Sequence, residues 1–374
     1  MNEIEELIAI SRFYGQNSDY VIAGGGNTSF KTADRLYVKA SGVSMGNIDE
    51  NGFAVLDRAK LECICSKRYS NNPEEREQEI KEDLMKSCVE PKKLLRPSVE
   101  TSMHNLINYR FVVHTHPTMV NALLCSQNAE VEANRIFGDD AVYVPYIDPG
   151  YSLFKEIEFC LRKYRDIHSV DPHIILLENH GIFVSADSVD EIKRIYDAVV
   201  SKIGAKIANQ LKIESLPVDD RAKDILRAIH KQLSVPVALI RNNTLISKFC
   251  EDFQSIAPFT PDIIVYCKAY PVVVENALDI DRAIVEIKIK FEEYFANHGY
   301  QPKIVILKGL GLVGLGDSNY SADIALDVFE DLMKITLYSK NFGGPHFLND
   351  TEIAFIENWE VENYRRSLLT KTVQ

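Results

Sequence analysis

Three histidines in two distant segments constrain this fold more than any other feature. His114 and His116 close an apolar run that begins at Phe111, and His180 follows much later in the chain. In an extended segment, residues two apart point to the same face, so His114 and His116 can reach one point. A fold that brings His180 there would form an open divalent-metal site with room for water or substrate. Taken alone, the His-x-His pair fits ordinary polar residues at a strand edge equally well.

Length, composition and charge limit the classes of protein to which this chain can belong. A chain of 374 residues favours two domains, which we place at residues 1–212 and 220–374. Hydrophobic residues at 46% and charged residues at 26% are typical of a folded globular protein. A net charge of -12 and a pI near 5.3 argue against nucleic-acid partners and anionic membranes. A local basic pocket for a phosphate remains compatible with this charge.

The compartment follows from the cysteines and from the N-terminus. The 7 cysteines show no framework spacing, and no signal peptide precedes them, which indicates reduced thiols. Residues 1–13 have the apolar spacing of an amphipathic helix rather than of a targeting segment. No apolar run approaches the ~20 residues that span a bilayer. We therefore expect a cytoplasmic protein without a membrane anchor.

The hydrophobic pattern predicts strands alternating with helices through the first two hundred residues. Predicted strands cover 19–24, 35–40, 111–116, 173–177 and 181–184. Predicted helices cover 1–13, 73–90 and 187–211, and two more begin at 97 and 117. Ser98 is the expected N-cap of the helix at 97, which places Glu100 in its first turn, where the helix dipole favours a carboxylate.

Residues 212–220 resemble a linker, because they combine a proline with two aspartates. Beyond it we predict a second, smaller α/β domain. Its predicted helices lie at 220–233, 279–298, 320–339 and 357–369, and its strands near 236–240, 262–266 and 303–307. Gly309–Gly314 matches G-x-G-x-x-G, but no helix follows at once, so we interpret it as a glycine-rich turn. We expect no internal repeat.

Five short motifs occur in one order and together resemble the class II aldolase/adducin family. These are Gly25-Gly26-Asn27-Thr28-Ser29, Ser41-Gly42, Pro97-Ser98-Val99-Glu100, His114-Thr115-His116-Pro117 and Asn179-His180-Gly181. The resemblance spans about residues 1–211 and is closest to the aldolase part of bifunctional rhamnulose-1-phosphate aldolase/dehydrogenase proteins. The dehydrogenase that would follow is missing before Gln374, so we expect no hydride chemistry.

The resemblance implies a fold, a reaction and a set of site residues. The implied fold is α/β (α+β), a three-layer domain with a central, mainly antiparallel sheet covered by helices. The implied reaction is zinc-dependent aldol cleavage of a ketose 1-phosphate to dihydroxyacetone phosphate and an aldehyde, in a homo-oligomer, commonly a tetramer. The zinc would bind His114, His116 and His180, and Glu100 would be the acid/base. The phosphate would bind Gly26, Asn27, Ser41, Gly42 and Ser98.

Several alternatives stay open. Some family members have a serine or threonine where Val99 stands, so the substrate could carry its phosphate differently or lack one. The second acid of the family aldolases, a tyrosine, could be Tyr143, Tyr146 or Tyr151. His104, one helical turn after Glu100, is expected to pack beneath the site rather than to orient the carboxylate. A sugar-phosphate dehydratase of the same family, or a non-catalytic adducin-like interaction module, are the alternative functions.

Overall fold

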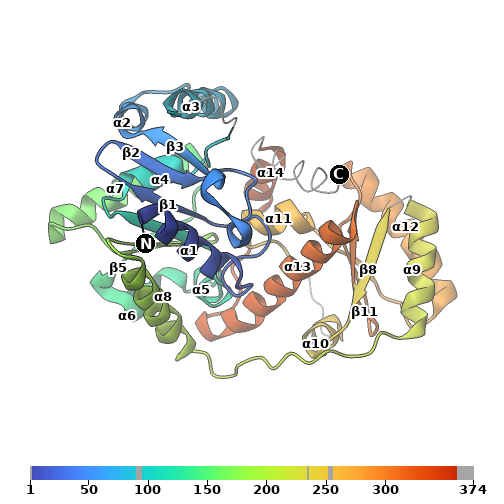
Figure 1. The fold of residues 1–374 in the computed structure, drawn as a ribbon. Coiled ribbons are helices and arrows are strands. Elements are labelled where there is room, and N and C mark those ends of the chain that lie inside the picture. Colours follow the sequence, from blue (N-terminus) through green and yellow to red (C-terminus); the bar gives the residue numbers. More distant parts are fainter. Residues whose placement is uncertain (1, 90–94, 234–235, 252–255, 360–374) are drawn as a thin grey trace. The chain divides into compact units, whose positions relative to one another are not determined.

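The computed structural model describes residues 2–89, 95–233, 236–251 and 256–359 (Figure 1). The chain divides into two compact units, Met1–Lys206 and Ile207–Gln374. Each unit is built around a β-sheet of its own. Among the described residues, we find no helix with the length and apolar character that crossing a membrane requires.

The first unit alternates strands with helices. Its strands are β1 (Asn27–Lys31), β2 (Arg35–Lys39), β3 (Phe53–Asp57), β4 (Phe111–Thr115), β5 (Ala141–Val144), β6 (Ile174–Leu177) and β7 (Gly181–Ala186). Its α-helices are α1 (Glu3–Gly15), α2 (Arg58–Ser66), α3 (Pro73–Ser87), α4 (Thr101–Leu106), α5 (Thr118–Leu124), α6 (Ala129–Phe137), α7 (Tyr151–His168) and α8 (Val189–Gly204). Single 3-10 turns are η1 (Met45–Asn47), η2 (Glu50–Gly52) and η3 (Gly138–Asp140).

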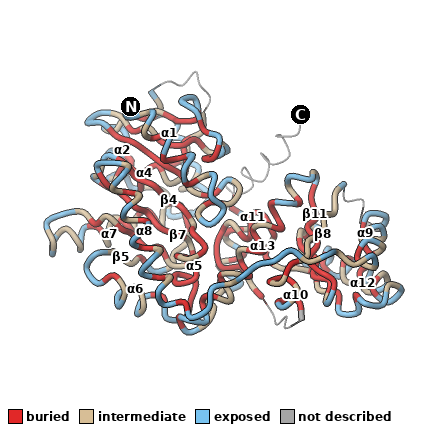
Figure 2. The backbone as a smooth tube through the Cα atoms, turned by 60° about the horizontal axis from the view of Figure 1, so that its bottom comes forward, coloured by how far each residue is buried: buried red, intermediate tan, exposed pale blue. Residues whose placement is uncertain are grey.

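The seven strands form one sheet in the order β3-β2-β1-β4-β7-β6-β5. Every neighbouring pair is antiparallel except β5 with β6. Helices α4 and α7 pack on one face, whereas α1, α5 and α8 contact the strands from the other. The central strands β4 and β7 are therefore buried along their whole length (Figure 2). These layers confirm the fold class that the sequence predicted.

Strand β1 shows how the sheet separates its two faces. Asn27 and Ser29 hydrogen-bond to residues on the α4 side, namely Ser98 and His104. Thr28, between them, lies on the opposite face, where its Oγ1 is 2.6 Å from the Ser11 hydroxyl of α1. The alternation follows from the two-residue period of a strand. It directs the polar side chains Asn27 and Ser29 toward the end of β4, where the histidines lie.

Two predicted strands are wrong. Residues 19–24 form turns instead, because the amides of Tyr20 and Val21 both bond back to the carbonyl of Asn17, and Ala23 is left-handed with φ 55°. Residues 262–266 lie in a helix, α11 (Pro261–Cys267), which begins with a proline at its first position. Proline is pre-organised for that position, and this signal outweighs the β-branched residues that follow it.

The second unit has a four-stranded sheet in the order β8-β11-β10-β9. Its strands are β8 (Val237–Arg241), β9 (Val272–Val274), β10 (Ile304–Leu307) and β11 (Gly311–Gly316). Its helices, beside α11, are α9 (Asp220–Leu233), α10 (Thr244–Glu251), α12 (Ile280–His298), α13 (Asn319–Ser339), the 3-10 turn η4 (Lys340–Phe342) and α14 (Asp350–Asn358). The predicted helix at 357–369 lies mostly outside the described residues.

The expectation of no internal repeat is wrong. The order β8-β11-β10-β9 of the second sheet matches the order β4-β7-β6-β5 of the first. In both sheets the first two pairings are antiparallel and the last is parallel. The two segments share only scattered identical residues, such as Gly181 with Gly311 and Ser188 with Ser318, so the repeat is clearer in the strand pairing than in the amino-acid sequence.

Helix α8 depends on its N-terminal cap, because it begins directly after β7. The Ser188 hydroxyl accepts a hydrogen bond from the amide of Glu191 at 3.3 Å. We predict that Ser188→Ala lowers the free energy of unfolding by about 1 kcal/mol, since an N-cap acceptor is lost. Urea denaturation measures this change. Ser188→Asp, which keeps an acceptor, should retain wild-type stability, and an equal loss in both variants would contradict the capping role.

Candidate metal centre

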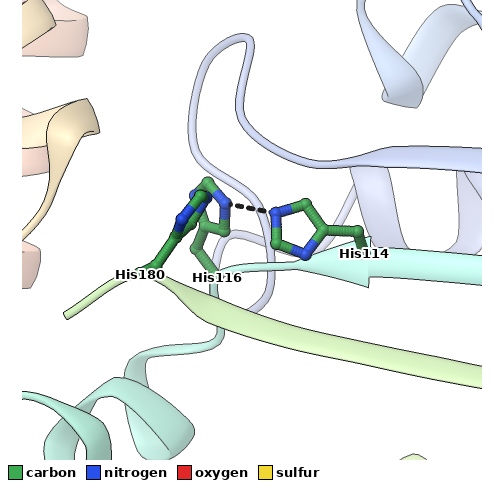
Figure 3. Close-up of side chains that lie close together, drawn as sticks. All are labelled: His114, His116 and His180. Carbon is green, nitrogen blue, oxygen red and sulfur yellow. Dashed lines mark hydrogen bonds between the residues drawn. The ribbon is translucent and has the colours of Figure 1, made fainter. Parts of the chain in front are cut away.

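Three imidazoles converge at one end of the first sheet. His114 lies in β4, His116 directly follows that strand, and His180 lies in the turn between β6 and β7 (Figure 3). One nitrogen of each ring lies within 4.8 Å of the others, and the Nε2 atoms of His114 and His116 are 3.0 Å apart. The cause is the pairing of β4 with β7, in which Thr115 lies opposite Ile182, so that His116 emerges beside the turn.

Close backbone approach makes this convergence possible. A Cβ on Gly181 would lie 2.6 Å from both the His116 ring and the carbonyl oxygen of Thr115, so a larger residue does not fit. Asn179 takes a left-handed conformation, with φ 52°, that closes the turn before His180. The amide of Asn121 donates to the carbonyl of His180 at 3.3 Å and holds the turn from outside. Glycine and asparagine suit these two backbone positions.

One histidine is oriented by the backbone. Nδ1 of His114 lies 3.0 Å from the carbonyl oxygen of Ile182. A carbonyl oxygen only accepts, so this nitrogen carries the hydrogen and Nε2 keeps its lone pair for the site. His114 is also fully buried and stacks on Phe183, with ring centroids 4.2 Å apart. The ring therefore faces the other two imidazoles in a fixed orientation.

Glu100 completes the cluster from the α4 side. It occupies the N-cap position of α4, where we had expected Ser98. Its Oε1 lies 3.3 Å from Nε2 of His114 and 3.4 Å from Nε2 of His180. Burial alone would raise the pKa of Glu100, but electrostatic attraction and hydrogen bonding from the imidazoles of His114 and His180 outweigh burial and hold that pKa well below its usual range. A bound cation would keep the carboxylate ionised for the same reason.

This donor set fits a divalent cation. Three neutral imidazoles and a nearby carboxylate are the ligand types that zinc prefers, and three protein nitrogens leave a coordination position open. Within the part of the chain that the structure describes, these histidines also form the group of potential ligands that could hold a metal. The geometry thus agrees with the metal-binding residues that the sequence suggested, while their role stays a proposal.

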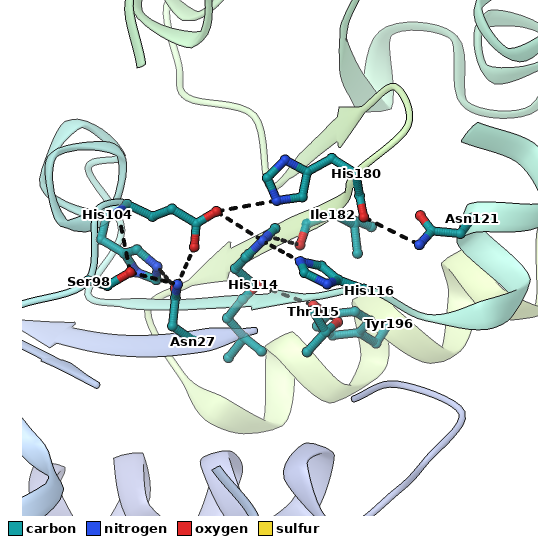
Figure 4. Close-up of polar contacts among 12 residues, drawn as sticks. Asn27, Ser98, His104, His114, Thr115, His116, Asn121, His180, Ile182 and Tyr196 are labelled. Atoms are coloured by element: carbon teal, nitrogen blue, oxygen red, sulfur yellow. Dashed lines mark hydrogen bonds and ion pairs between the residues drawn. The ribbon is translucent and has the colours of Figure 1, made fainter. Parts of the chain in front are cut away.

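A buried chain of hydrogen bonds that the sequence did not predict joins Asn27, Ser98 and His104 (Figure 4). The amide nitrogen of Asn27 donates to Oε2 of Glu100 and to the Ser98 hydroxyl. Nε2 of His104 bonds to the amide oxygen of Asn27, and Nδ1 of His104 lies 2.7 Å from the Ser29 hydroxyl. Because an amide oxygen only accepts, His104 carries its hydrogen on Nε2 and accepts from Ser29 on Nδ1.

His104 therefore does more than pack beneath the site, which was the role we had favoured. It is fully buried against Phe183, and it also fixes which way the amide of Asn27 points. That orientation directs the amide nitrogen at Glu100. Burial lowers the pKa of His104 well below its usual range, so the imidazole stays neutral and keeps the required tautomer. The four-residue spacing from Glu100 was the only sequence signal for this arrangement.

The residues expected to bind phosphate lie on neighbouring loops. Gly26 and Gly42 are both left-handed, with φ 67° and 84°. The Ser41 hydroxyl donates to the carbonyl of Pro97 at 3.3 Å, which joins the loop of Ser41 and Gly42 to the segment before Ser98. The Ser98 hydroxyl accepts from Asn27 and from the amide of Glu100, both at 3.2 Å. In this structure the polar groups of Asn27 and Ser98 are thus used inside the protein.

The three candidate tyrosines differ in position. The backbone amide of Tyr146 donates to Glu178, two residues before His180, at 2.8 Å. Burial raises the pKa of Tyr143, and the nearby Glu178 raises it further. Tyr151 instead packs on Tyr69, with ring centroids 5.5 Å apart, next to apolar residues of α7. Tyr143 and Tyr146 are therefore the two that lie near the turn that carries His180.

Comparison with known proteins identifies the family. The model of the class II aldolase and adducin N-terminal domain matches residues 5–201, and that of the aldolase class II second domain matches residues 241–365. The chain therefore belongs to the class II aldolase and adducin family, as the five sequence motifs indicated.

The individual relatives share only low sequence identity with this chain. A Bacillus subtilis (strain 168) protein named uncharacterized oxidoreductase YuxG is 24% identical over 415 residues, covering 98% of this chain but 58% of that protein. L-fuculose phosphate aldolase of Methanocaldococcus jannaschii is 23% identical over 172 residues, covering 44% of this chain and 73% of that enzyme. A solved N-terminal class II aldolase domain from Thermoplasma acidophilum is 30% identical, covers 55% of this chain and 93% of that structure, and has a TM-score of 0.47.

The buried His104 gives a prediction about pH. Its pKa in the folded protein lies below the unfolded value of about 6.5, so its stabilising contribution is present above that pH and is lost as pH falls. We predict that wild-type protein loses more stability between about pH 7.5 and 5 than His104→Gln does. Urea denaturation at both pH values measures the difference. Equal losses in the two proteins would show that His104 is not held neutral.

Proposed function

We propose that this chain is a divalent-metal-dependent lyase that cleaves a ketose 1-phosphate, such as rhamnulose 1-phosphate, into dihydroxyacetone phosphate and an aldehyde. One observation carries the proposal: Glu100 lies within 3.4 Å of two of the three imidazoles that converge at the end of β4. Membership of the class II aldolase family supports the reaction class. The relative named L-fuculose phosphate aldolase supports the substrate class.

Aldol cleavage needs a positive charge near the carbonyl oxygen of the substrate. Breaking a carbon–carbon bond next to a carbonyl leaves negative charge on the carbonyl oxygen. A divalent cation, for which we propose zinc, held by His114, His116 and His180 would supply the Lewis acidity that stabilises this charge. Neutral imidazoles do not reduce the charge of the cation, so they suit this role better than three carboxylates would.

Glu100 is the proposed acid/base, which moves a proton at the carbon next to the ketone. Its two oxygens have different surroundings. Oε2 accepts from the amide of Asn27, whereas Oε1 faces the imidazoles, where the reacting atoms would lie. A hydrogen bond to one oxygen fixes the plane of the carboxylate and leaves the other for proton transfer. We propose that His104 acts through Asn27 as a positioning residue.

The phosphate end of the substrate would bind beside this cluster. We propose that Gly26, Asn27, Ser41, Gly42 and Ser98 form this pocket. Left-handed glycines expose backbone amides to an anion, and hydroxyl groups add donors. Since Ser98 and Asn27 bond to each other in this structure, a phosphate would compete with that contact. We further propose a homo-oligomer, with a tetramer as the state to test by light scattering.

The direct test is a screen of ketose phosphates and free ketoses with product analysis. We expect retro-aldol release of dihydroxyacetone phosphate together with an aldehyde. An intact carbon skeleton that has lost water would instead identify a dehydratase. A folded protein that takes up no divalent metal would contradict the enzyme and favour an adducin-like interaction module.

Two substitutions separate the base from the metal site. We predict that Glu100→Gln keeps the bound metal but loses at least about 100-fold in kcat, because the carboxylate acts on the proton. His114→Ala should lose both the metal and the activity, since it removes a ligand. Metal content by mass spectrometry and steady-state kinetics measure the two effects. Near wild-type turnover in Glu100→Gln would remove Glu100 from the mechanism.

A further inference from the structure

The two sheets match residue by residue as well as in strand order. A constant difference in residue number relates β5, β6 and β7 to β9, β10 and β11. A second constant difference relates β4 to β8. Equivalent Cα pairs are His114–Phe183 and Ile240–Val313, Ile174–Val184 and Ile304–Gly314, and Val142–Ile175 and Val272–Val305. A shift of one residue in either sheet would move every side chain to the opposite face, so a shared register is a specific match.

The turns between the strands match too. The C-cap residues that follow α7 and α12 are Ser169 and Gly299, and both are left-handed, with φ 59° and 73°. Asn179 in the β6–β7 turn has φ 52°, and Gly309 in the β10–β11 turn has φ 75°. Left-handed backbone is uncommon outside glycine, so its recurrence at two equivalent positions is informative.

Side-chain contacts recur at the same offset. Tyr164 packs on His168 at the end of α7, with ring centroids 4.2 Å apart, and Tyr294 packs on His298 at the end of α12, at 4.5 Å. Ser188 caps α8, and Ser318 caps α13.

The glycine at the close approach recurs as well. A Cβ on Gly181 would meet the carbonyl oxygen of Thr115 at 2.6 Å, and one on Gly311 would meet that of Arg241 at 2.7 Å. Arg241 is the counterpart of Thr115 in the shared register. Both turns therefore bring the following strand onto its neighbour in the same way.

The metal-binding positions are where the copies differ. The counterparts of His114, His116 and His180 are Ile240, Asn242 and Leu310. Leu310 is 2% exposed and belongs to an apolar cluster against which Ile240 packs. The cluster also holds Ala222, Ile225 and Ile229 of α9. The amide of Asn242 donates to the carbonyl of Pro217 at 3.4 Å. An open polar site is thus replaced by hydrophobic core.

We propose that the second unit is a copy of the metal-bearing half of the first, in which three ligand positions were replaced by Ile240, Asn242 and Leu310. Within the described residues, the proposed metal centre of the first unit would then have no counterpart in the second. The second unit keeps a backbone frame that binds a divalent metal once imidazoles return to those positions. The proposal does not depend on lyase activity, because its readout is metal binding.

The backbone of the second unit retains a carbonyl group that could accept a hydrogen bond from an introduced imidazole. In the first unit the carbonyl of Ile182 accepts from Nδ1 of His114. Its counterpart, Leu312, pairs with Arg241 just as Ile182 pairs with Thr115. An imidazole in place of Ile240 therefore meets the same kind of backbone acceptor, which would direct its other nitrogen to the site.

The experiment starts from a chain without the first site, His114→Ala/His116→Ala/His180→Ala. Into this background we place Ile240→His, Asn242→His and Leu310→His. Zinc content after desalting, and cobalt absorption in the visible range, report on metal binding. We expect no metal in the background and one per chain after the three additions. A folded protein with the additions that binds no metal would overturn the proposal.

A matched control carries Ala238→His, Ile240→His and Leu310→His in the same background. It has the same number of added histidines, but one is moved from position 242 to position 238, which is four residues along the chain, or roughly 13 Å. We expect at least about tenfold weaker zinc binding than in the first set, because the third ligand is out of reach. Equal affinity in the two sets would show that the frame does not define the site.

If the added histidines prevent folding, two single substitutions at Gly309 test the correspondence between the two units. Asn179 takes the same backbone conformation as Gly309, so Gly309→Asn should keep the melting temperature. The nearest atom to a new Cβ there is a Leu278 side chain at 3.4 Å, an ordinary contact. Gly309→Val should lower the melting temperature by roughly 3 °C or more, because a β-branched residue disfavours this conformation. An equal drop in both variants would contradict the correspondence.

Discussion

The antiparallel pairing of β4 with β7 is the constraint on which the rest of the site depends. It places the end of one strand beside the beginning of the other, so that His116 and His180 become neighbours although they are far apart in sequence. Gly181 allows this approach because no Cβ stands between the strands. Both strands are buried on both faces, so packing fixes their register. The convergence of the three imidazoles is therefore a consequence of the sheet pairing.

A buried hydrogen-bond network supports the carboxylate of Glu100. Ser29, His104 and Asn27 form a hydrogen-bonded chain that ends at Glu100. Such a buried network is stable when each donor has an acceptor, and its partners then define one orientation for every member. Alternation along β1 supplies two of these residues from a single strand. Glu100 is thereby held against the imidazoles from behind, which is the support that its proposed role in proton transfer needs.

The two units show how one backbone frame serves different purposes. In the first unit the strand ends carry imidazoles, and the frame forms a polar centre. In the second, Ile240 and Leu310 stand at the same positions and join an apolar core. The turns, caps and left-handed residues are shared, whereas the chemistry is not. The chemical character of each unit thus depends on a few side chains placed on a common fold.

The sequence by itself determined the main elements and the candidate ligands. Local signals can be recognised directly in the sequence. They include the apolar run before His114, the helix-forming residues of α3 and α8, and the five motifs. Tertiary structure decided what depends on distant partners. It gave His104 a partner in Asn27, and it revealed a repeat that is clearer in the strand register than in the residues. Hydrogen bonds and strand pairing join positions far apart, and no spacing along the chain records which of them meet.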